Sequence, residues 1–167
     1  MTLQLNSRAD FTIENYAEAA WGGAAVTFSA AALQRMVEGG RLEPAHQNAL
    51  RFYDDVAYDD TFNGLVFDVD EGDRLARCLA EKRVLFCGNH GVVVIGRTVA
   101  EAFDDLYFLE RACQVQILAM STGRPLRNVK DEVAKATFGN CDTGQFAHQH
   151  FSALKRLLDR DEPDYAQ

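Results

Sequence analysis

One histidine in this chain is placed where an imidazole could bind a metal ion or move a proton. His90 lies in the run Gly88-Asn89-His90-Gly91, between the apolar runs VLFC and VVVI. Glycine and asparagine allow the positive φ values of a tight turn, and glycine lets the backbone approach a ligand closely. Imidazole is a common metal ligand and the usual acid or base near neutral pH. We therefore predict that His90 projects from this turn into a cleft and is the best candidate for a metal ligand.

The two apolar runs beside His90 predict a pair of β-strands. Residues 83–87 and 92–95 are rich in β-branched and aromatic side chains and are too short for helices. Because only a tight connection separates them, we expect antiparallel neighbours. Next, Thr98-Val99-Ala100-Glu101 has the pattern of a capping box, in which the Thr98 hydroxyl and the Glu101 carboxylate each accept from the other residue's amide. A long helix should begin there.

The apolar residues of that helix recur at three- and four-residue steps, but a carboxylate lies in line with them. The predicted stripe is Val99, Phe103, Leu106, Glu110, Cys113, Ile117 and Met120. We expect Phe103 and Leu106, with Cys87 and Val94 of the strands, to be largely buried against one sheet face. Glu110 should reach the surface or meet a partner at the site side of the strands, since burying an unpaired carboxylate is costly.

The other three histidines are weaker candidates for metal ligands. His148 and His150 lie two residues apart on a predicted helix, so their rings point about 200° apart and cannot share one metal ion. We expect one of them on the surface and the other packed between helices. His46 follows Pro44 in a loop, and a lone polar residue usually lies on the surface.

The acidic residues at 54, 55, 59 and 60 also invite a metal-site hypothesis. Their spacing lacks the alternate acids, central glycine and closing glutamate of an EF-hand loop. A solvated acidic loop is the better interpretation.

Composition limits the class of protein. The 167 residues suit one domain, and a net charge of −8 argues against nucleic acid or anionic lipid as a partner. The four cysteines, at 78, 87, 113 and 141, are widely spaced, which excludes a disulfide framework and indicates buried thiols in a reducing compartment. No apolar run is long enough to span a membrane. We therefore expect a cytoplasmic protein with no membrane partner.

Strands and helices alternate along the rest of the chain. We predict strands at Ala25–Phe28, Ala49–Tyr53 and Gly64–Phe67, and helices from Ser29 to Gly39, after Asp70, and at 130–138 and 145–160. Leu75, Cys78 and Leu79 should form the buried face of the helix after Asp70. Short connections between strands and helices favour an α/β fold with a mixed or antiparallel sheet flanked by helices.

The run GNHGVVVIGRTVAEAFDDLYFLERACQVQ resembles the signature of the class II aldolase/adducin family, which includes fuculose-phosphate aldolase and ribulose-phosphate 4-epimerase. The likeness extends from Glu38 to Tyr165. It implies a three-layer α/β/α fold with a mixed, largely antiparallel sheet, incomplete at its N-terminal side. It also implies a single domain over residues 1–167, in which 1–40 are atypical and 41–165 are family-like.

The resemblance also implies a metal site, because the last histidine of the family's three-histidine zinc site falls on His90. In metal-dependent relatives, Zn²⁺ polarises a carbonyl group and stabilises an enediolate, so the resemblance implies an aldehyde-lyase or epimerase acting on a sugar phosphate or similar hydroxy-carbonyl compound. Relatives place such sites between subunits, so a homo-oligomer is expected. The family's His-x-His strand end here reads Val26-Thr27-Phe28-Ser29. Two of the three expected metal histidines are therefore not found, and we expect well under one zinc per chain.

Three functions remain open after the sequence alone. The first is an aldolase-type lyase whose missing groups come from a partner chain or from residues 1–37. The second is a non-catalytic, adducin-like binding or assembly module. The third is a shortened or rearranged product without activity. Metal content separates the first from the others, and oligomeric state with partner capture separates the second from the third.

Overall fold

A computed structural model describes residues 2–5, 25–28, 40–61, 63–64, 69–141 and 144–166. The chain divides into two units, Met1–Gly40 and Arg41–Gln167, and each is described by itself. In the first unit, β1 (Thr2–Leu5) pairs in parallel with β2 (Ala25–Phe28), which confirms the predicted strand at residues 25–28. The helix predicted after Ser29 lies outside the described residues, as does most of the strand predicted at 64–67. The single-domain assignment stays a prediction.

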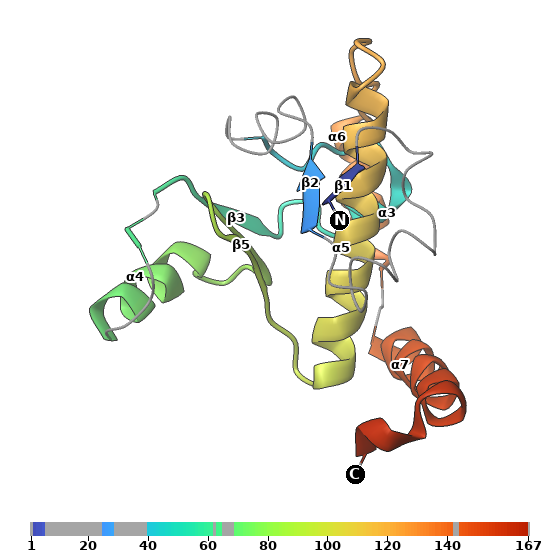
Figure 1. Ribbon diagram of the computed structural model, residues 1–167. Helices are drawn as coiled ribbons and strands as arrows, with labels where there is room; N and C mark the ends of the chain where they lie inside the picture. The colour runs from blue at the N-terminus through green and yellow to red at the C-terminus, as the bar shows by residue number, and fades with distance from the viewer. Residues whose placement is uncertain are drawn as a thin grey trace. The chain divides into compact units, whose positions relative to one another are not determined.

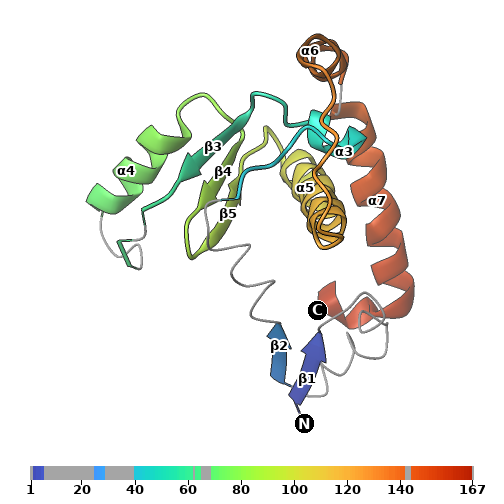
Figure 2. The ribbon, with the colours of Figure 1, turned by 90° about the horizontal axis from the view of Figure 1, so that it is seen from above.

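The second unit contains a small sheet and the helices around it (Figure 1). Its elements are α3 (Gln47–Leu50), β3 (Val56–Asp59), α4 (Val69–Leu79), β4 (Val84–Cys87), β5 (Gly91–Val94), α5 (Val99–Met120), α6 (Asp131–Gly139), α7 (Gly144–Asp161) and the 3₁₀ helix η2 (Pro163–Ala166). In Figures 1 and 2, α4 and α5 lie on opposite sides of the sheet, and Figure 2 shows α7 beyond α5. The two predicted C-terminal helices are confirmed to within one residue at each end. The helix expected after Asp70 begins at Val69, so Asp70 lies in its first turn.

The sheet of this unit has the order β3-β4-β5. β4 and β5 are antiparallel, as predicted, and their register places Val84 opposite Val94 and Cys87 opposite Gly91. β3 and β4 are parallel, because α4 forms the crossover connection that a parallel pair requires. The sheet is therefore mixed, as expected. The expectation of a largely antiparallel sheet is wrong for the described strands, since β1–β2 and β3–β4 are both parallel.

The hydrophobic core of the second unit centres on Phe52, Val84 and Leu109, which come from the turn after α3, from β4 and from α5. The strand predicted at Ala49–Tyr53 is wrong, because this segment is α3 followed by a turn. His46 caps the helix, its Nδ1 accepting a hydrogen bond from the Asn48 amide at 3.3 Å. Such a cap satisfies one free donor of the first turn.

The buried face of α5 differs from the predicted stripe. Its buried residues are Ala100, Asp104, Asp105, Leu109 and Ala112. Phe103 and Leu106 are 37% and 43% exposed, Glu110 is exposed, and Cys87 and Val94 are only partly buried. Apolar residues occur around most of this helix, so their spacing alone could not identify the packed face. The face that packs carries two alanines, which allow close approach, and two aspartates, which meet arginines.

The capping box is confirmed in one half. The Glu101 amide donates to the Thr98 hydroxyl at 3.2 Å, so α5 begins where predicted. The Glu101 carboxylate accepts from the Arg97 amide at 3.0 Å and from the Arg97 guanidinium, rather than from the amide of Thr98. Together, these hydrogen bonds of Thr98 and Glu101 fix the path of the chain between β5 and α5.

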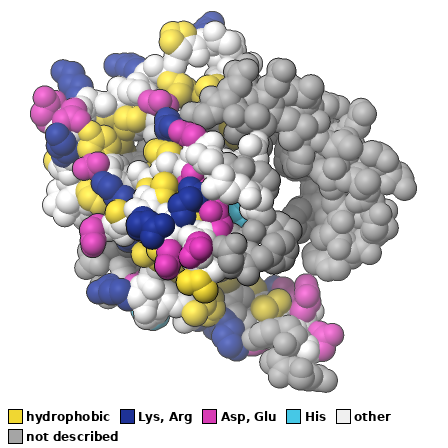
Figure 3. All heavy atoms as spheres, turned by 90° about the vertical axis from the view of Figure 1, so that its left-hand side faces the viewer, with side chains coloured by type: hydrophobic (Ala, Val, Ile, Leu, Met, Phe, Trp, Pro, Cys, Tyr) yellow, Lys and Arg dark blue, Asp and Glu magenta, His cyan; other side chains and the backbone are white. Residues whose placement is uncertain are grey.

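Charge is mixed on the surface around α4 and the sheet. Figure 3 shows basic and acidic side chains interspersed with hydrophobic ones among the coloured residues of that face. An extended basic stripe, which a nucleic-acid backbone would favour, is not seen there. No helix among the described residues is long and apolar enough to cross a membrane.

Candidate functional site

His90 lies in the turn that joins β4 to β5. The His90 amide donates to the Cys87 carbonyl at 3.2 Å, which closes the turn. The Gly88 amide donates to the Asp59 carbonyl at 2.6 Å, so the turn is held against the end of β3. The His90 side chain is exposed. This turn therefore presents one imidazole at the edge of the sheet where β3 and β4 both end.

The two glycines of the turn serve different purposes. A Cβ on Gly88 would lie 3.1 Å from the Asp59 carbonyl oxygen, so glycine allows close approach to β3. The positive φ values fall on Asn89, at 55°, and on Gly91, at 155°. Gly91 is thus favoured by backbone conformation and Gly88 by space. The predicted Gly-Asn-His-Gly turn is confirmed with this change.

The acidic residues near this edge are paired with arginines. Asp59 accepts two bonds from Arg74, at 3.0 and 2.6 Å, and one from the Thr61 amide at 3.0 Å. Arg74 holds the pKa of Asp59 below its usual value. Asp60 is bound by Arg41 at 2.8 and 2.6 Å, which likewise lowers the pKa of Asp60. Neither carboxylate is free to join His90 without giving up its arginine.

The acidic segment is therefore not simply a solvated loop. Asp54 and Asp60 are exposed as expected, but Asp55 and Asp59 are buried. Asp55 accepts from the Arg83 backbone amide at 3.0 Å and from the Arg83 guanidinium. Buried carboxylates persist because such partners replace the lost water.

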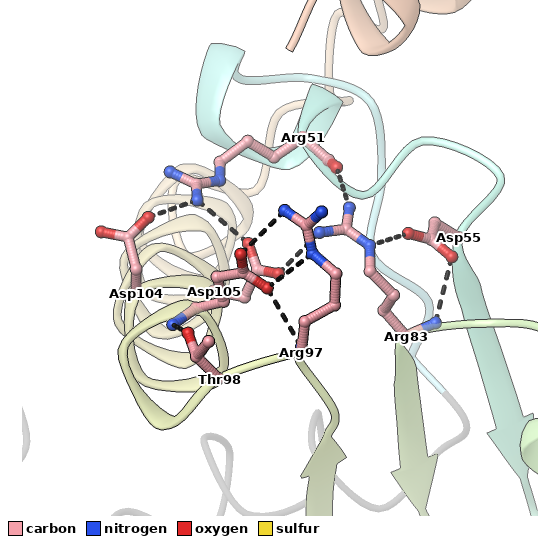
Figure 4. A network of polar contacts seen from close by, with 8 residues as sticks. Arg51, Asp55, Arg83, Arg97, Thr98, Asp104 and Asp105 are labelled. Carbon is pink, nitrogen blue, oxygen red and sulfur yellow. Dashed lines mark hydrogen bonds and ion pairs between the residues drawn. The ribbon is translucent and has the colours of Figure 1, made fainter. Parts of the chain in front are cut away.

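A chain of ion pairs connects α3, α5 and β4 (Figure 4). Arg51 binds Asp104 at 2.5 Å and Asp105 at 3.0 Å, and Arg83 binds Asp105 at 2.6 Å and also Asp55. The buried carboxylates of α5 are therefore Asp104 and Asp105. The sequence predicted a carboxylate in line with the packed face at Glu110, and the carboxylates on that face are these two aspartates. The signal in the sequence was their spacing: Asp104 lies four residues after Ala100, and Asp105 four residues before Leu109, on the face that proved to be buried.

The histidine pair of α7 behaves as predicted. His148 is exposed, whereas His150 is partly buried and its Nδ1 lies 2.7 Å from an oxygen of Asp104. The His150 ring is packed edge-on against Tyr107, with centroids 4.8 Å apart. His150 therefore helps to hold α7 against α5, and the two rings do not form a metal site.

The described residues do not fit a self-contained zinc site. The described residues contain all four histidines, at 46, 90, 148 and 150, and within them no three His, Cys, Asp or Glu side chains gather so that they could hold a metal ion. A catalytic zinc ion needs about three protein ligands and an open position. His90 offers one imidazole, His46 caps α3 and His150 contacts Asp104. The structure does not test His90 as a ligand, and the assignment stays a prediction.

The cysteines are all free thiols. Cys78, Cys87 and Cys113 are partly buried, and burial raises the pKa of Cys113 to about 11 and that of Cys87 above its usual value. Cys141 is exposed, so the expectation of four buried thiols is wrong at that position. A raised pKa disfavours the thiolate, which is the form that attacks electrophiles or binds metal.

A family model described as Class II Aldolase and Adducin N-terminal domain matches residues 23–117. Decarboxylase NovR of Streptomyces niveus is 34% identical over 131 residues, which are 75% of this chain and 46% of that protein. Beta-adducin of Homo sapiens is 34% identical over 133 residues, 71% of this chain and 18% of that protein. A crystal structure of an aldolase II superfamily protein from Pseudomonas syringae superimposes with a TM-score of 0.71 at 29% identity, covering 95% of this chain and 65% of that one.

The match begins at residue 23, upstream of Glu38, where the likeness noted in the sequence begins. The chain spans about half the length of the curated bacterial relatives it matches, and less of beta-adducin. These relatives are named after different roles, a decarboxylase and an adducin among them, so likeness to them indicates a shared fold rather than a shared reaction.

Proposed function

This chain belongs to the class II aldolase and adducin family, and from that premise we propose that it is a binding or assembly domain built on the aldolase fold. It does not act as a self-contained metal-dependent lyase. The single observation that carries the proposal is the separation of the four histidines, which have different surroundings. The proposal includes the family's three-layer α/β/α architecture, which the positions of α4 and α5 on opposite sides of the sheet support (Figure 2).

The polar groups near His90 support a structural rather than a catalytic use. The carboxylates of Asp59 and Asp60 are each held by an arginine through two hydrogen bonds. Bidentate pairs of this kind are among the stronger hydrogen bonds in proteins. A metal ion at His90 would have to compete with an arginine to gain a carboxylate ligand from Asp59 or Asp60.

Exposed apolar side chains support association with another protein surface. Val93 and Ile95 lie two residues apart along and just after β5, so their side chains share one side of the sheet, and they are 39% and 45% exposed. Exposed apolar side chains that lie side by side are typical of interaction sites. We propose a second copy of this chain as the partner, which agrees with the homo-oligomer expected from the sequence.

The second candidate function is an aldolase-type lyase with a composite site. The observation that favours it is the exposure of His90 at the end of two parallel strands, where its imidazole is accessible to ligands from another chain. In this case a small hydroxy-carbonyl compound would be the substrate. The remaining zinc ligands would come from outside the described residues.

Metal content and molecular mass, measured on the same purified sample, test the proposal. Plasma emission gives zinc per chain and sedimentation velocity gives the mass, for the wild type and for His90→Ala. We expect well below one zinc per chain in both, with self-association in both. The matched control is His148→Ala, which removes an exposed histidine from α7.

Stoichiometric zinc that is lost in His90→Ala and retained in His148→Ala would overturn the proposal in favour of the composite lyase. A monomer without zinc would also contradict it, because neither an assembly nor a metal site would then exist. Zinc-free oligomers of both variants would support it.

A further inference from the structure

A cavity of about 260 Å³ lies between α3, the C-terminal half of α5 and the loop at residues 122–127. None of the residues of the His90 turn lines it. Its loop 122–127 also lies beyond the matched residues 23–117. This cavity is therefore separate from the His90 turn, and a ligand bound in it would not depend on the proposed function.

The wall of the cavity is largely apolar, with the small side chains of Ala49, Ala112 and Ala119 beside the larger ones of Val115 and Leu126. Alanines from α3 and α5 leave space where larger side chains would fill it. The volume falls just below the roughly 300–1,000 Å³ of ordinary ligand pockets. A molecule with a single ring or a short branched chain suits a space of this size.

The frame of the cavity is fixed by hydrogen bonds between distant parts of the chain. Gln116 of α5 accepts from the Glu43 amide at 2.7 Å and donates to the Arg41 carbonyl at 2.8 Å. The Val129 amide donates to the Pro44 carbonyl at 2.8 Å. These bonds connect the segment before α3, helix α5 and the segment after the 122–127 loop. A site held in this way needs little ordering when a ligand binds.

Two guanidinium groups line the cavity without a carboxylate partner in the described part of the chain. Arg124 and Arg127 are exposed lining residues, and neither guanidinium forms a hydrogen bond or ion pair with a described residue. Glu43, the carboxylate of the lining, accepts from the Asn128 amide group at 2.7 Å instead. In a chain with a net charge of −8, two unmatched cations at one apolar cavity indicate an anionic ligand.

A histidine adds a third donor to the lining. His46 accepts the Asn48 amide bond at Nδ1, which leaves the proton of a neutral imidazole on Nε2. An N–H group and two guanidinium groups can bind an anion, and a guanidinium matches a carboxylate with two parallel bonds. The apolar wall favours a singly charged organic anion over inorganic phosphate, because less charge must be desolvated.

We propose that this cavity binds a small organic carboxylate, with its carboxylate group at Arg124 and Arg127 and its apolar body against the alanine-lined wall. Benzoate is the probe. Benzyl alcohol is its neutral counterpart of similar shape, and inorganic phosphate is an anion without an apolar body.

The test is a titration of the full chain followed by protein NMR chemical shifts. We expect benzoate to bind the wild type, and Arg124→Gln/Arg127→Gln to weaken its Kd about tenfold or more, the change expected for losing a charge-assisted pair. Ala119→Phe should abolish binding by filling the cavity. Arg156→Gln, which removes an exposed arginine from α7, should leave the Kd unchanged.

Four results would overturn the proposal. They are no binding of benzoate to the wild type, an unchanged Kd in the double arginine variant, equal affinity for benzyl alcohol, and equal affinity for inorganic phosphate. Because both arginines are exposed, the double variant should fold normally. It therefore keeps the test decisive if Ala119→Phe fails to fold.

Discussion

At the scale of single residues, the buried charges of α5 decide how the helix is held. Asp104 is 1% exposed and contacts both Arg51 and His150. Two charged or polar groups from two other elements therefore converge on one carboxylate. Removing it would leave Arg51 largely buried, and Asp105 would be its one remaining carboxylate partner among the described residues.

Replacing Asp104 with alanine should accordingly destabilise the protein by about 3–5 kcal/mol, the usual loss when one partner of a buried ion pair is removed. Urea unfolding followed by circular dichroism measures this change. Asp161→Asn is the control, since Asp161 lies on the surface beside Arg160 and its loss should leave the unfolding midpoint unchanged. A loss below about 1 kcal/mol at Asp104 would show that the network does not stabilise the fold.

Arg74 gives a second prediction at this scale, which concerns acid. It bonds both Asp59 and Glu71, and it holds the pKa of each below the ordinary values of 3.8 and 4.5. A carboxyl with a lowered folded pKa stabilises the fold above its unfolded pKa, and this stability disappears as the pH falls through the folded value. Arg74→Gln should therefore be less stable than the wild type at pH 6.

The difference between Arg74→Gln and the wild type should then narrow as the pH drops below about 4. Urea midpoints measured across this range give the comparison. Arg77→Gln on the same helix is the control, because Arg77 is exposed and no contact to Asp59 or Glu71 involves it. A difference that stays constant down to acid pH would contradict the ion-pair explanation.

The role of a side chain could be predicted from the sequence only where the positions of nearby residues along one helix or turn determine which way it points. The divergence of His148 and His150 follows from helical rotation, and it is confirmed. The burial of Asp55, Asp59 and Asp104 could not be predicted, because their arginines come from distant parts of the chain. For the same reason Arg124 and Arg127 gave no signal, since the cavity beside them forms only when α3 and α5 meet.

At the scale of elements, α5 shows which face of a helix packs. Leu109 is 1% exposed and belongs to the core cluster with Phe52 and Val84. Leu106, three residues earlier, is 43% exposed. The two leucines form a matched pair within one helix, so the same truncation can be compared at both positions.

Leu109→Ala should cost about 2–5 kcal/mol, because it removes buried methyl groups and leaves a cavity. Leu106→Ala should cost well under half as much, since water already reaches that side chain. Chemical unfolding of both variants against the wild type gives the two values. Equal losses would mean that α5 packs through the stripe predicted from periodicity, and the larger loss at Leu106 would reverse the assignment.

Element bounds followed from the sequence where the signals were local. The turn at His90, the cap at Thr98 and the strands beside them are confirmed because a few adjacent residues determine each. The strand that the sequence predicts at Ala49–Tyr53 is wrong. Ala49, Leu50 and Phe52 are all buried, and in so short a run a helix followed by a turn buries such residues as well as a strand does.

At the scale of the whole molecule, the family and the α/β class could be predicted, and the mixed sheet with them. The parallel β3–β4 pair could have been expected from the intervening helix at 69–79. The zinc site is a different case. The resemblance identified one ligand position, His90, and the sequence already showed that the other two histidines were missing from their expected place.

The last prediction concerns how copies of the chain associate. Among the described strands, β5 pairs only with β4, so its other edge offers backbone donors and acceptors for pairing, and Val93 on it is 39% exposed. Natural proteins protect such edges with charge, with cover or with a partner. Val93→Lys should therefore shift sedimentation toward the monomer, because a charge at the edge opposes strand pairing. Leu157→Lys, on the exposed surface of α7, should sediment as the wild type does. If Leu157→Lys dissociates the assembly and Val93→Lys does not, the copies meet through α7 instead.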